Sequence, residues 1–325
     1  MCERFAVFAL ACLFIGTGSF TAAAKGQSGD TLERPAISVT LLGTGTPVPS
    51  ATQAGAAILV EAGDETLLFD CGRGCTTRLA QLNPALIAKI DRLFVTHLHS
   101  DHVVGIDDLW LNGWLQGRDE PLSIWGPKGL KKMMRYLRKA YSADIRQRIN
   151  DGVPATVGGI AESFTELKTT GVIYEENGVT VTAVSVEHVP GEPCFGYKVE
   201  VDGRSVFVSG DTTLTDALFL FGKDVDVLIQ EVVSPALVGY LQNTFDKNQV
   251  DSIVSIHTTA AQAGALFGQT KPRLAVFYHT KSEGAFSASL LEETSAFYAG
   301  AVVVGHDLMR IDVGDKITVS PIEER

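Results

Sequence analysis

Short apolar runs separated by turn residues dominate the chain from Ile37 onward. Runs of four to eight residues rich in Val, Ile and Phe, bounded by Gly, Asp or Pro, are typical of buried strands. A helical region is predicted at 104–170, and a further helix is predicted to begin near Thr259. The predicted strands are 37–42, 57–62, 66–69, 92–95, 179–186, 195–201, 205–208, 225–232, 274–278, 302–305 and 317–320. Two β-rich halves with intervening helices predict an α/β fold of two helix-covered sheets in a single domain.

The N-terminus has a different pattern from the rest of the chain. Arg4 precedes an apolar run over 5–16, and Thr21-Ala22-Ala23-Ala24 offers a small-residue cleavage site. This arrangement predicts a signal peptide over 1–24 and a periplasmic or secreted protein, with no membrane contact after cleavage. An uncut membrane anchor is the alternative, although the apolar run is short for a span. Residues 25–36 are predicted to form a flexible leader before the domain at 37–325.

The chain is acidic, with 38 Asp and Glu against 27 Lys and Arg and a formal net charge of −11. A strongly acidic protein repels polyanions at long range, which argues against nucleic acid as a partner. Residues 128–148 are an exception, because they carry eight Lys and Arg among apolar residues at helical spacing. An amphipathic helix with a solvated basic face is one interpretation, and a nucleic-acid surface is the other. The sequence leaves the oligomeric state open, a dimer included.

Three of the seven histidines lie in one segment, His97-Leu98-His99-Ser100-Asp101-His102, directly after the predicted strand at 92–95. His97 and His99 are two residues apart, so on an extended chain they project to one side. Asp101 and His102 follow where the chain should turn toward a helix. Imidazole and carboxylate donors at this density suit zinc, and manganese or iron would also accept them.

Three further donors each follow an apolar strand. His188 comes after the run 179–186, Asp211 after 205–208, and His279 after 274–278. Each is a weak signal alone, because a lone histidine is usually a satisfied core or surface residue. Their shared context predicts that they meet at one edge of the sheets, where loop residues converge. His306 has no such context and is predicted to be structural.

These motifs, in this order, resemble the metal motifs of the metallo-β-lactamase superfamily. Several other segments are similar to its ribonuclease Z and arylsulfatase-like branch: Leu42-Gly43-Thr44-Gly45, Phe69-Asp70-Cys71-Gly72, Trp125-Gly126-Pro127-Lys128-Gly129 and His257-Thr258-Thr259-Ala260. The resemblance covers residues 38–312. It implies a four-layer αββα sandwich with a dinuclear metal site at one edge of the two sheets.

The resemblance also implies a role for each donor. Two zinc ions, or manganese or iron in their place, would share Asp211 as a bridge. The other donors would divide into His97, His99 and His188 for one ion and Asp101, His102 and His279 for the second. Asp70 resembles the family's aspartate that orients a ligand histidine through its other ring nitrogen, with a simple turn aspartate as the alternative.

A pair of metal ions that activates a shared water molecule is typical of hydrolases, so the resemblance implies a hydrolase. Asp101 is predicted to accept a proton from the nucleophile. His257 matches a histidine of the ribonuclease Z branch and is predicted to protonate the leaving oxygen. Glu231 matches that histidine's carboxylate partner, which would raise the pKa of His257. The alternative is that His257 merely caps the helix starting near Thr259.

Departures from the ribonuclease Z pattern bear on the substrate. The loop 47–54 lacks that family's arginine, and only residues 189–210 separate His188 from Asp211, too few for a tRNA-clamping arm. With the acidic charge and export, this favours an arylsulfatase-like hydrolase of sulfate or phosphate esters, with a small-molecule ester as substrate. The alternatives are a ribonuclease Z-type phosphodiesterase, a lactonase or β-lactamase on the same fold, and an inert metal-binding protein. The segment 105–150 is expected to roof the site.

Overall fold

The computed structural model describes residues 35–154 and 156–321. The predicted signal peptide and most of the predicted leader lie outside the described residues. No helix within the described ranges is long and apolar enough to cross a membrane.

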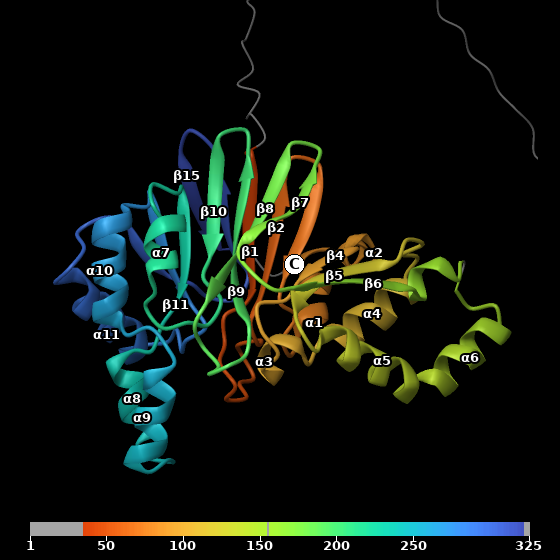
Figure 1. The fold of residues 1–325 in the computed structure, drawn as a ribbon, viewed down its shortest axis with the longest axis horizontal. Helices are drawn as coiled ribbons and strands as arrows, with labels where there is room; N and C mark the ends of the chain where they lie inside the picture. The colour runs from red at the N-terminus through yellow and green to blue at the C-terminus, as the bar shows by residue number, and fades with distance from the viewer. Residues whose placement is uncertain (1–34, 155, 322–325) are drawn as a thin grey trace, which may run out of the picture. The chain divides into compact units, whose positions relative to one another are not determined.

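Two sheets form the centre of the fold (Figure 1). The first has eight strands in the order β15-β14-β1-β2-β3-β4-β5-β6, and the second has seven in the order β13-β12-β11-β10-β9-β8-β7. The strands of the first sheet are β1 (Ile37–Gly43), β2 (Ala57–Ala62), β3 (Glu65–Phe69), β4 (Arg92–Phe94), β5 (Leu122–Pro127), β6 (Glu162–Leu167), β14 (Met309–Val313) and β15 (Ile317–Pro321). Those of the second are β7 (Gly171–Glu176), β8 (Val179–Val186), β9 (Cys194–Val201), β10 (Arg204–Val208), β11 (Val227–Glu231), β12 (Leu274–Tyr278) and β13 (Val302–Val304).

Helices cover the outer face of each sheet, which confirms the predicted αββα layering (Figure 1). On the first sheet these are α1 (Cys75–Leu82), α2 (Ala85–Lys89), α4 (Ile106–Leu115), α5 (Leu130–Ala140) and α6 (Ser142–Asn150). On the second they are α7 (Asp216–Phe221), α10 (Ala260–Thr270) and α11 (Ala285–Ser295). The remaining helices are α3 (Ser100–Val103), η1 (Gly158–Ile160), α8 (Pro235–Leu241) and α9 (Lys247–Ser255).

Alternation along the strands produces these layers. In β1, Ile37, Val39 and Leu41 face the core between the sheets, whereas Leu42 faces the helices outside. Because side chains of a strand point to opposite faces in turn, a strand that is buried on both faces reads as a continuous apolar run. Such central strands were therefore visible in the sequence.

The prediction of a helical region at 104–170 is wrong in part, because this region also contains the strands β5 and β6. β6 lies at the edge of its sheet, and of its six residues only Leu167 is buried, so its apolar signal is weak. The strands β7 and β14 were also absent from the prediction. β7 lies at an edge of its sheet, whereas β14 lies inside its sheet and alternates buried with half-buried residues. A search for continuous apolar runs misses such strands.

Strand direction determines where a site can form. β10, β11 and β12 are parallel neighbours, so their carboxyl ends lie at one edge of the second sheet. In sheets of this kind, ligands bind outside the carboxyl ends of the strands. The loop after β4 of the first sheet reaches the same edge, because Phe195 N donates to Thr96 O at 3.0 Å.

Candidate metal centre

The first sheet contributes one continuous segment, the metal loop, defined here as residues 96–102. His99 is the N-cap of the short helix α3, with extended backbone angles, and Asp101 lies in the helix's first turn. Gly72 lies directly beneath, and a Cβ there would be only 2.1 Å from the carbonyl oxygen of Asp101. Any larger residue at Gly72 would displace the loop, so glycine at this position allows the turn after β3 to support it.

The second sheet contributes single residues from separate strand ends. His188 follows β8, Asp211 follows β10, and His279 follows β12 directly. Two backbone positions here lie in the left-handed region, Gly210 at φ 63° and His279 at φ 53°. A non-glycine residue in this region is uncommon and costs free energy, and such positions cluster at functional sites.

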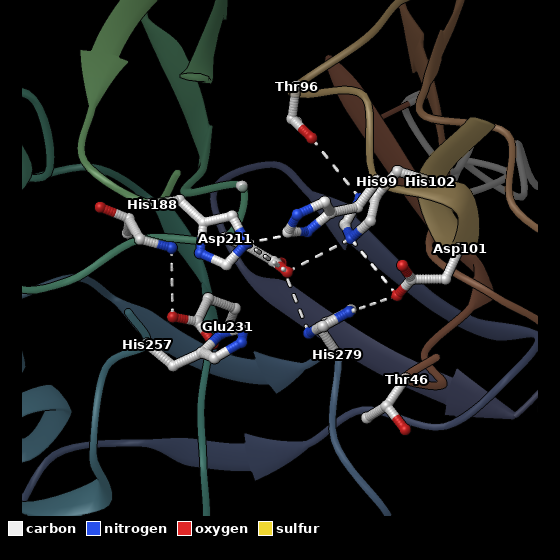
Figure 2. Close-up of polar contacts among 12 residues, drawn as sticks. Thr46, Thr96, His99, Asp101, His102, His188, Asp211, Glu231, His257 and His279 are labelled. Carbon is white, nitrogen blue, oxygen red and sulfur yellow. Dashed lines mark hydrogen bonds and ion pairs between the residues drawn. The ribbon is translucent and has the colours of Figure 1, made fainter. Parts of the chain in front are cut away.

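All seven predicted ligand side chains meet at this edge (Figure 2). Asp211 lies at the centre, with one carboxylate oxygen, Oδ2, 3.3 Å from His102 Nε2 and 3.9 Å from His97 Nε2. His188 Nε2 is 3.8 Å from the same oxygen and 3.1 Å from His99 Nδ1. On the other side, His279 Nε2 is 3.0 Å from Asp101 Oδ2. Figure 2 labels these side chains except that of His97 and shows the labelled ones pointing toward one another.

Three of the histidines are held through Nδ1, so that Nε2 faces the centre of the site. His102 Nδ1 donates to Asp70 Oδ2 at 2.7 Å, and His188 Nδ1 donates to the Ile256 carbonyl at 2.8 Å. The Thr96 hydroxyl donates to Asp70 and therefore accepts from His97 Nδ1 at 3.0 Å. Such partners fix the tautomer and the ring orientation of metal-binding histidines. Asp70 makes the contact expected of an orienting aspartate.

The electrostatics of the site favour a cation. Burial, followed by the neighbouring His102, lowers the pKa of His97 well below its ordinary value, so this ring stays neutral and able to coordinate. Burial also opposes protonation of His102, but Asp211 and Asp70 outweigh it and raise the pKa of that ring. Buried carboxylates that attract a proton this strongly would equally attract a metal ion.

Several buried polar atoms at the centre lack partners. Within the described part of the chain, His97 Nε2, His102 Nε2 and Asp211 Oδ1 form no hydrogen bond. Leaving a buried polar group unsatisfied costs about 1–3 kcal/mol, so atoms placed like this suit the binding of a cation. The ligand atoms of His97, His99 and His188 lie within 4.8 Å of one another, and so do those of Asp101, His102 and His279. Asp211 belongs to two further groups of this kind, one with His97 and His102 and one with His188 and His257. The clusters can therefore bind metal.

The buried Glu231 and the half-buried His257 form a pair beside the metal ligands. Glu231 Oε2 lies 3.0 Å from His257 Nδ1, while Oε1 accepts from Thr258 N at 2.8 Å and Thr212 N at 3.2 Å. Burial alone would lower the pKa of His257, but the Glu231 carboxylate outweighs it and raises the pKa to about 9. The N-cap of α10 is Thr259 and not His257, so capping does not explain this histidine.

The segment 105–150 does not roof the site as expected. Trp110 and Trp114 are buried in the core beneath the first sheet, and Trp125 stacks on Phe94. The helices α8 and α9 instead contribute side chains beside the metal ligands, Leu237 among them. Sequence reasoning missed this pair of short amphipathic helices because they carry no titratable motif. His306 is exposed and donates to or accepts from no metal-centre residue among those described, consistent with a structural role.

Comparisons with known proteins agree with this geometry. The family described as anti-Pycsar protein Apyc1 matches residues 37–235. The ribonuclease Z of Mycobacterium bovis is 30% identical over 284 residues, which cover 85% of this chain and 98% of that protein.

Solved structures share the fold. The metallo-β-lactamase fold protein YhfI from Bacillus subtilis has a TM-score of 0.62 at 21% identity, covering 84% of this chain and 98% of its own. The short form of human tRNase Z has a TM-score of 0.62 at 21% identity, covering 85% and 99%. Zinc-bound PqqB from Methylobacterium extorquens has a TM-score of 0.58 at 14% identity, covering 85% and 100%.

The prediction from the sequence that nucleic acid is an unlikely partner is wrong. The acidic charge was taken to argue against nucleic acid and for a small-molecule ester, yet the relatives are named for cleavage of RNA. Net charge averages over the whole surface, and a local basic face is enough to bind a polyanion. The relatives also favour the ribonuclease Z alternative over the arylsulfatase-like interpretation.

Proposed function

We propose that this chain, which belongs to the anti-Pycsar Apyc1 family and to the ribonuclease Z branch of the metallo-β-lactamase superfamily, is a phosphodiesterase that cleaves RNA. The chain is a metal-dependent hydrolase that acts on ester bonds. The convergence of seven metal-binding side chains from both sheets, in a chain similar to almost the full length of a ribonuclease Z, carries the proposal.

Two zinc ions are the proposed cofactor. His97, His99 and His188 would hold one, Asp101, His102 and His279 the other, and Asp211 would bridge them. Mixed nitrogen and oxygen donors suit zinc, and manganese or iron would fit the same set. When bound, such a pair supplies Lewis-acid activation of water and of the phosphoryl oxygens.

Asp101 is the proposed proton acceptor on the side of the attacking water. Its Oδ2 already contacts His279, which leaves its second oxygen available (Figure 2). Burial would raise the pKa of Asp101, but the contact with His279 and the charge of His102 lower it overall. Asp101 therefore stays ionised and can receive a hydrogen bond from water.

His257 is the proposed proton donor to the leaving oxygen. Its pairing with Glu231 keeps it protonated near neutral pH, because its pKa lies at about 9. An alkoxide is a poor leaving group, so a nearby imidazolium that protonates it lowers the barrier. Glu231 positions the ring and does not itself reach the substrate, since the side chain is fully buried.

The basic face of α5 supports a polyanionic substrate. Five of its eleven residues are Lys or Arg and none is acidic. Arg138 pairs with Glu162, whereas Lys131, Lys132 and Arg135 are exposed and form no ion pair within the described residues. The helix begins beside the metal loop, because Leu98 packs against its N-cap, Gly129. A bound RNA strand could thus pass from the metal centre onto this face.

The test is cleavage of labelled RNA by the zinc-loaded protein, with a nitrophenyl sulfate assayed in parallel. We expect cleavage of RNA, loss of cleavage with a chelator, and its return on adding zinc. A single 2′-deoxy residue at the cleaved nucleotide should still allow cleavage, because water and not the 2′-hydroxyl is the nucleophile. Turnover of the sulfate without any cleavage of RNA would contradict the proposal.

We also propose that the protein is periplasmic or secreted, because residues 1–24 have the pattern of a signal peptide. These residues lie outside the described part of the chain. An exported ribonuclease would meet RNA outside the cytoplasm. Detecting the mature protein in the periplasm or medium, with its N-terminus at or after Lys25, would test it.

A further inference from the structure

A pocket opens directly onto the metal centre. It has a volume of about 260 Å³, and His99, Asp211, His257 and His279 are among the residues that line it. The remaining walls are almost entirely apolar. They include side chains from the loop after β1 and from residues 234–256, here called the α8–α9 segment, namely Val48, Leu237, Leu241, Phe245, Ile253 and Ile256.

The α8–α9 segment is a small unit with its own apolar cluster. Leu237, Leu241 and Val250 are buried together, with Ile253 packed against them. Ser234 caps α8 through Leu237 N at 3.0 Å, and Asp246 caps α9 in a capping box with Gln249. These caps fix both helix starts, and the segment extends from the body of the fold (Figure 1). The pocket wall is therefore preformed.

The chemistry of the pocket differs from that of the metal centre beside it. No Lys or Arg lines it, so it offers nothing to a second phosphate. Its volume lies just below the range of about 300–1,000 Å³ typical of sites for drug-sized ligands, so one ring system is the largest group that fits. Phe245 is 37% exposed at the rim and stacks on no other aromatic ring among the described residues.

We propose that this pocket holds the nucleobase of the nucleotide next to the cleaved phosphate, with Phe245 stacking on the base. The proposal rests on the function proposed above, since it places the phosphate on the metal centre. His257, the proposed proton donor to the leaving oxygen, lines the pocket, so the base belongs to the leaving-group side of the substrate. Stacking accepts every base, because each has a π-face, and it would select nucleotides over other phosphate esters without reading sequence.

The test is calorimetric titration of the zinc-loaded protein with adenosine 5′-monophosphate and adenosine 3′-monophosphate, and with ribose 5-phosphate as the probe without a base. The wild type should bind at least one adenosine monophosphate about tenfold more tightly than ribose 5-phosphate, a difference in the lower part of the range for base stacking. Phe245→Ala should lose this preference and still bind ribose 5-phosphate as the wild type does.

Tyr240→Ala is the matched control. Tyr240 is an aromatic residue of the same segment, 39% exposed, but it lies outside the pocket and contacts Phe286 and Lys281 instead. It should keep the full preference for the base. Equal affinity of the wild type for all three probes, or an unchanged preference in Phe245→Ala, would overturn the proposal.

This readout is independent of RNA cleavage. If RNA is cleaved but the base adds no affinity, the pocket is wrong and the proposed function stands. If the base adds affinity through Phe245 but RNA is not cleaved, the pocket stands and the enzyme acts on a different nucleotide ester.

Discussion

The two sheets contribute to the metal centre in opposite ways. The first supplies four donors from one loop of seven residues, supported from beneath by Asp70 and Gly72. The second supplies three donors from three strand ends far apart in the sequence. The first half is specified locally, by a strand, a turn and a short helix. The second half exists only when β8, β10 and β12 are in register, so it reports on the whole fold.

The support of the ligands differs in the same way. His102 is oriented by a carboxylate of its own sheet, whereas His188 is oriented by the backbone carbonyl of Ile256, at the end of the α8–α9 segment. A substitution of Asp70 can remove the carboxylate that orients His102, whereas no side-chain substitution removes the backbone carbonyl that orients His188. The two halves can thus be perturbed separately, and the size of each effect shows what that half contributes.

The largest effect is expected at the residue that joins the halves. Asp211→Asn removes a carboxylate that lies within 4 Å of histidines in both groups of ligands, so we expect at least about a 1,000-fold loss of kcat and the loss of bound metal. Asp226→Asn is the control, because Asp226 is a buried carboxylate before β11 that pairs with Arg273 away from the centre. The metal content and the rate of RNA cleavage are measured for both variants. Full metal content with full activity in Asp211→Asn would rule out a bridging role.

His257→Ala should leave metal content intact and slow esters in proportion to how poor their leaving group is. Loss of a general acid costs about 100-fold or more on alkyl or nucleotide leaving groups, and little on nitrophenyl esters, which need no proton. Rates on a nitrophenyl and an alkyl phosphodiester measure this. A proton-donor role is excluded if both substrates slow equally.

Asp70→Asn tests the support of the first half. Loss of a carboxylate that orients a ligand histidine typically costs about 10- to 100-fold in metal affinity or activity. Asp307→Asn is matched to it, since Asp307 also anchors backbone amides, Thr44 N at 2.9 Å and Ala54 N at 2.7 Å, but contacts no metal ligand among the described residues. Competition with a zinc indicator gives both affinities. The same affinity in the two variants would show that Asp70 is only a turn residue.

The smallest effect at neutral pH is expected for Glu231→Gln. The carboxylate raises the pKa of His257 to about 9, so the protonated donor persists up to that pH and is lost above it. Without the charge, the pKa should fall toward or below its ordinary value near 6.5, and the alkaline limb of the rate profile should move to lower pH. The pH profile of kcat/KM on an alkyl diester measures the shift. An unmoved alkaline limb would assign it to another group.

The predictability of each half follows from its construction. The metal loop was readable because its donors are adjacent, and the central strands were readable because burial on both faces makes apolar runs. His188, Asp211 and His279 became readable only through their position after such runs. The edge strand β6 and the α8–α9 segment were not, because a search for continuous apolar runs passes over half-solvated elements and an apolar pocket wall has no chemical motif. The substrate was misjudged because the net charge of the chain was given more weight than the basic stretch at 128–148, which contains the basic face of α5.

Anomalous diffraction at the zinc edge, from crystals of the zinc-loaded protein, would locate the metal ions. We expect two peaks per chain about 3.5–4 Å apart, one among His97, His99 and His188 and the other among Asp101, His102 and His279, with Asp211 between them. A single peak, or peaks away from this edge of the sheets, would contradict this expectation.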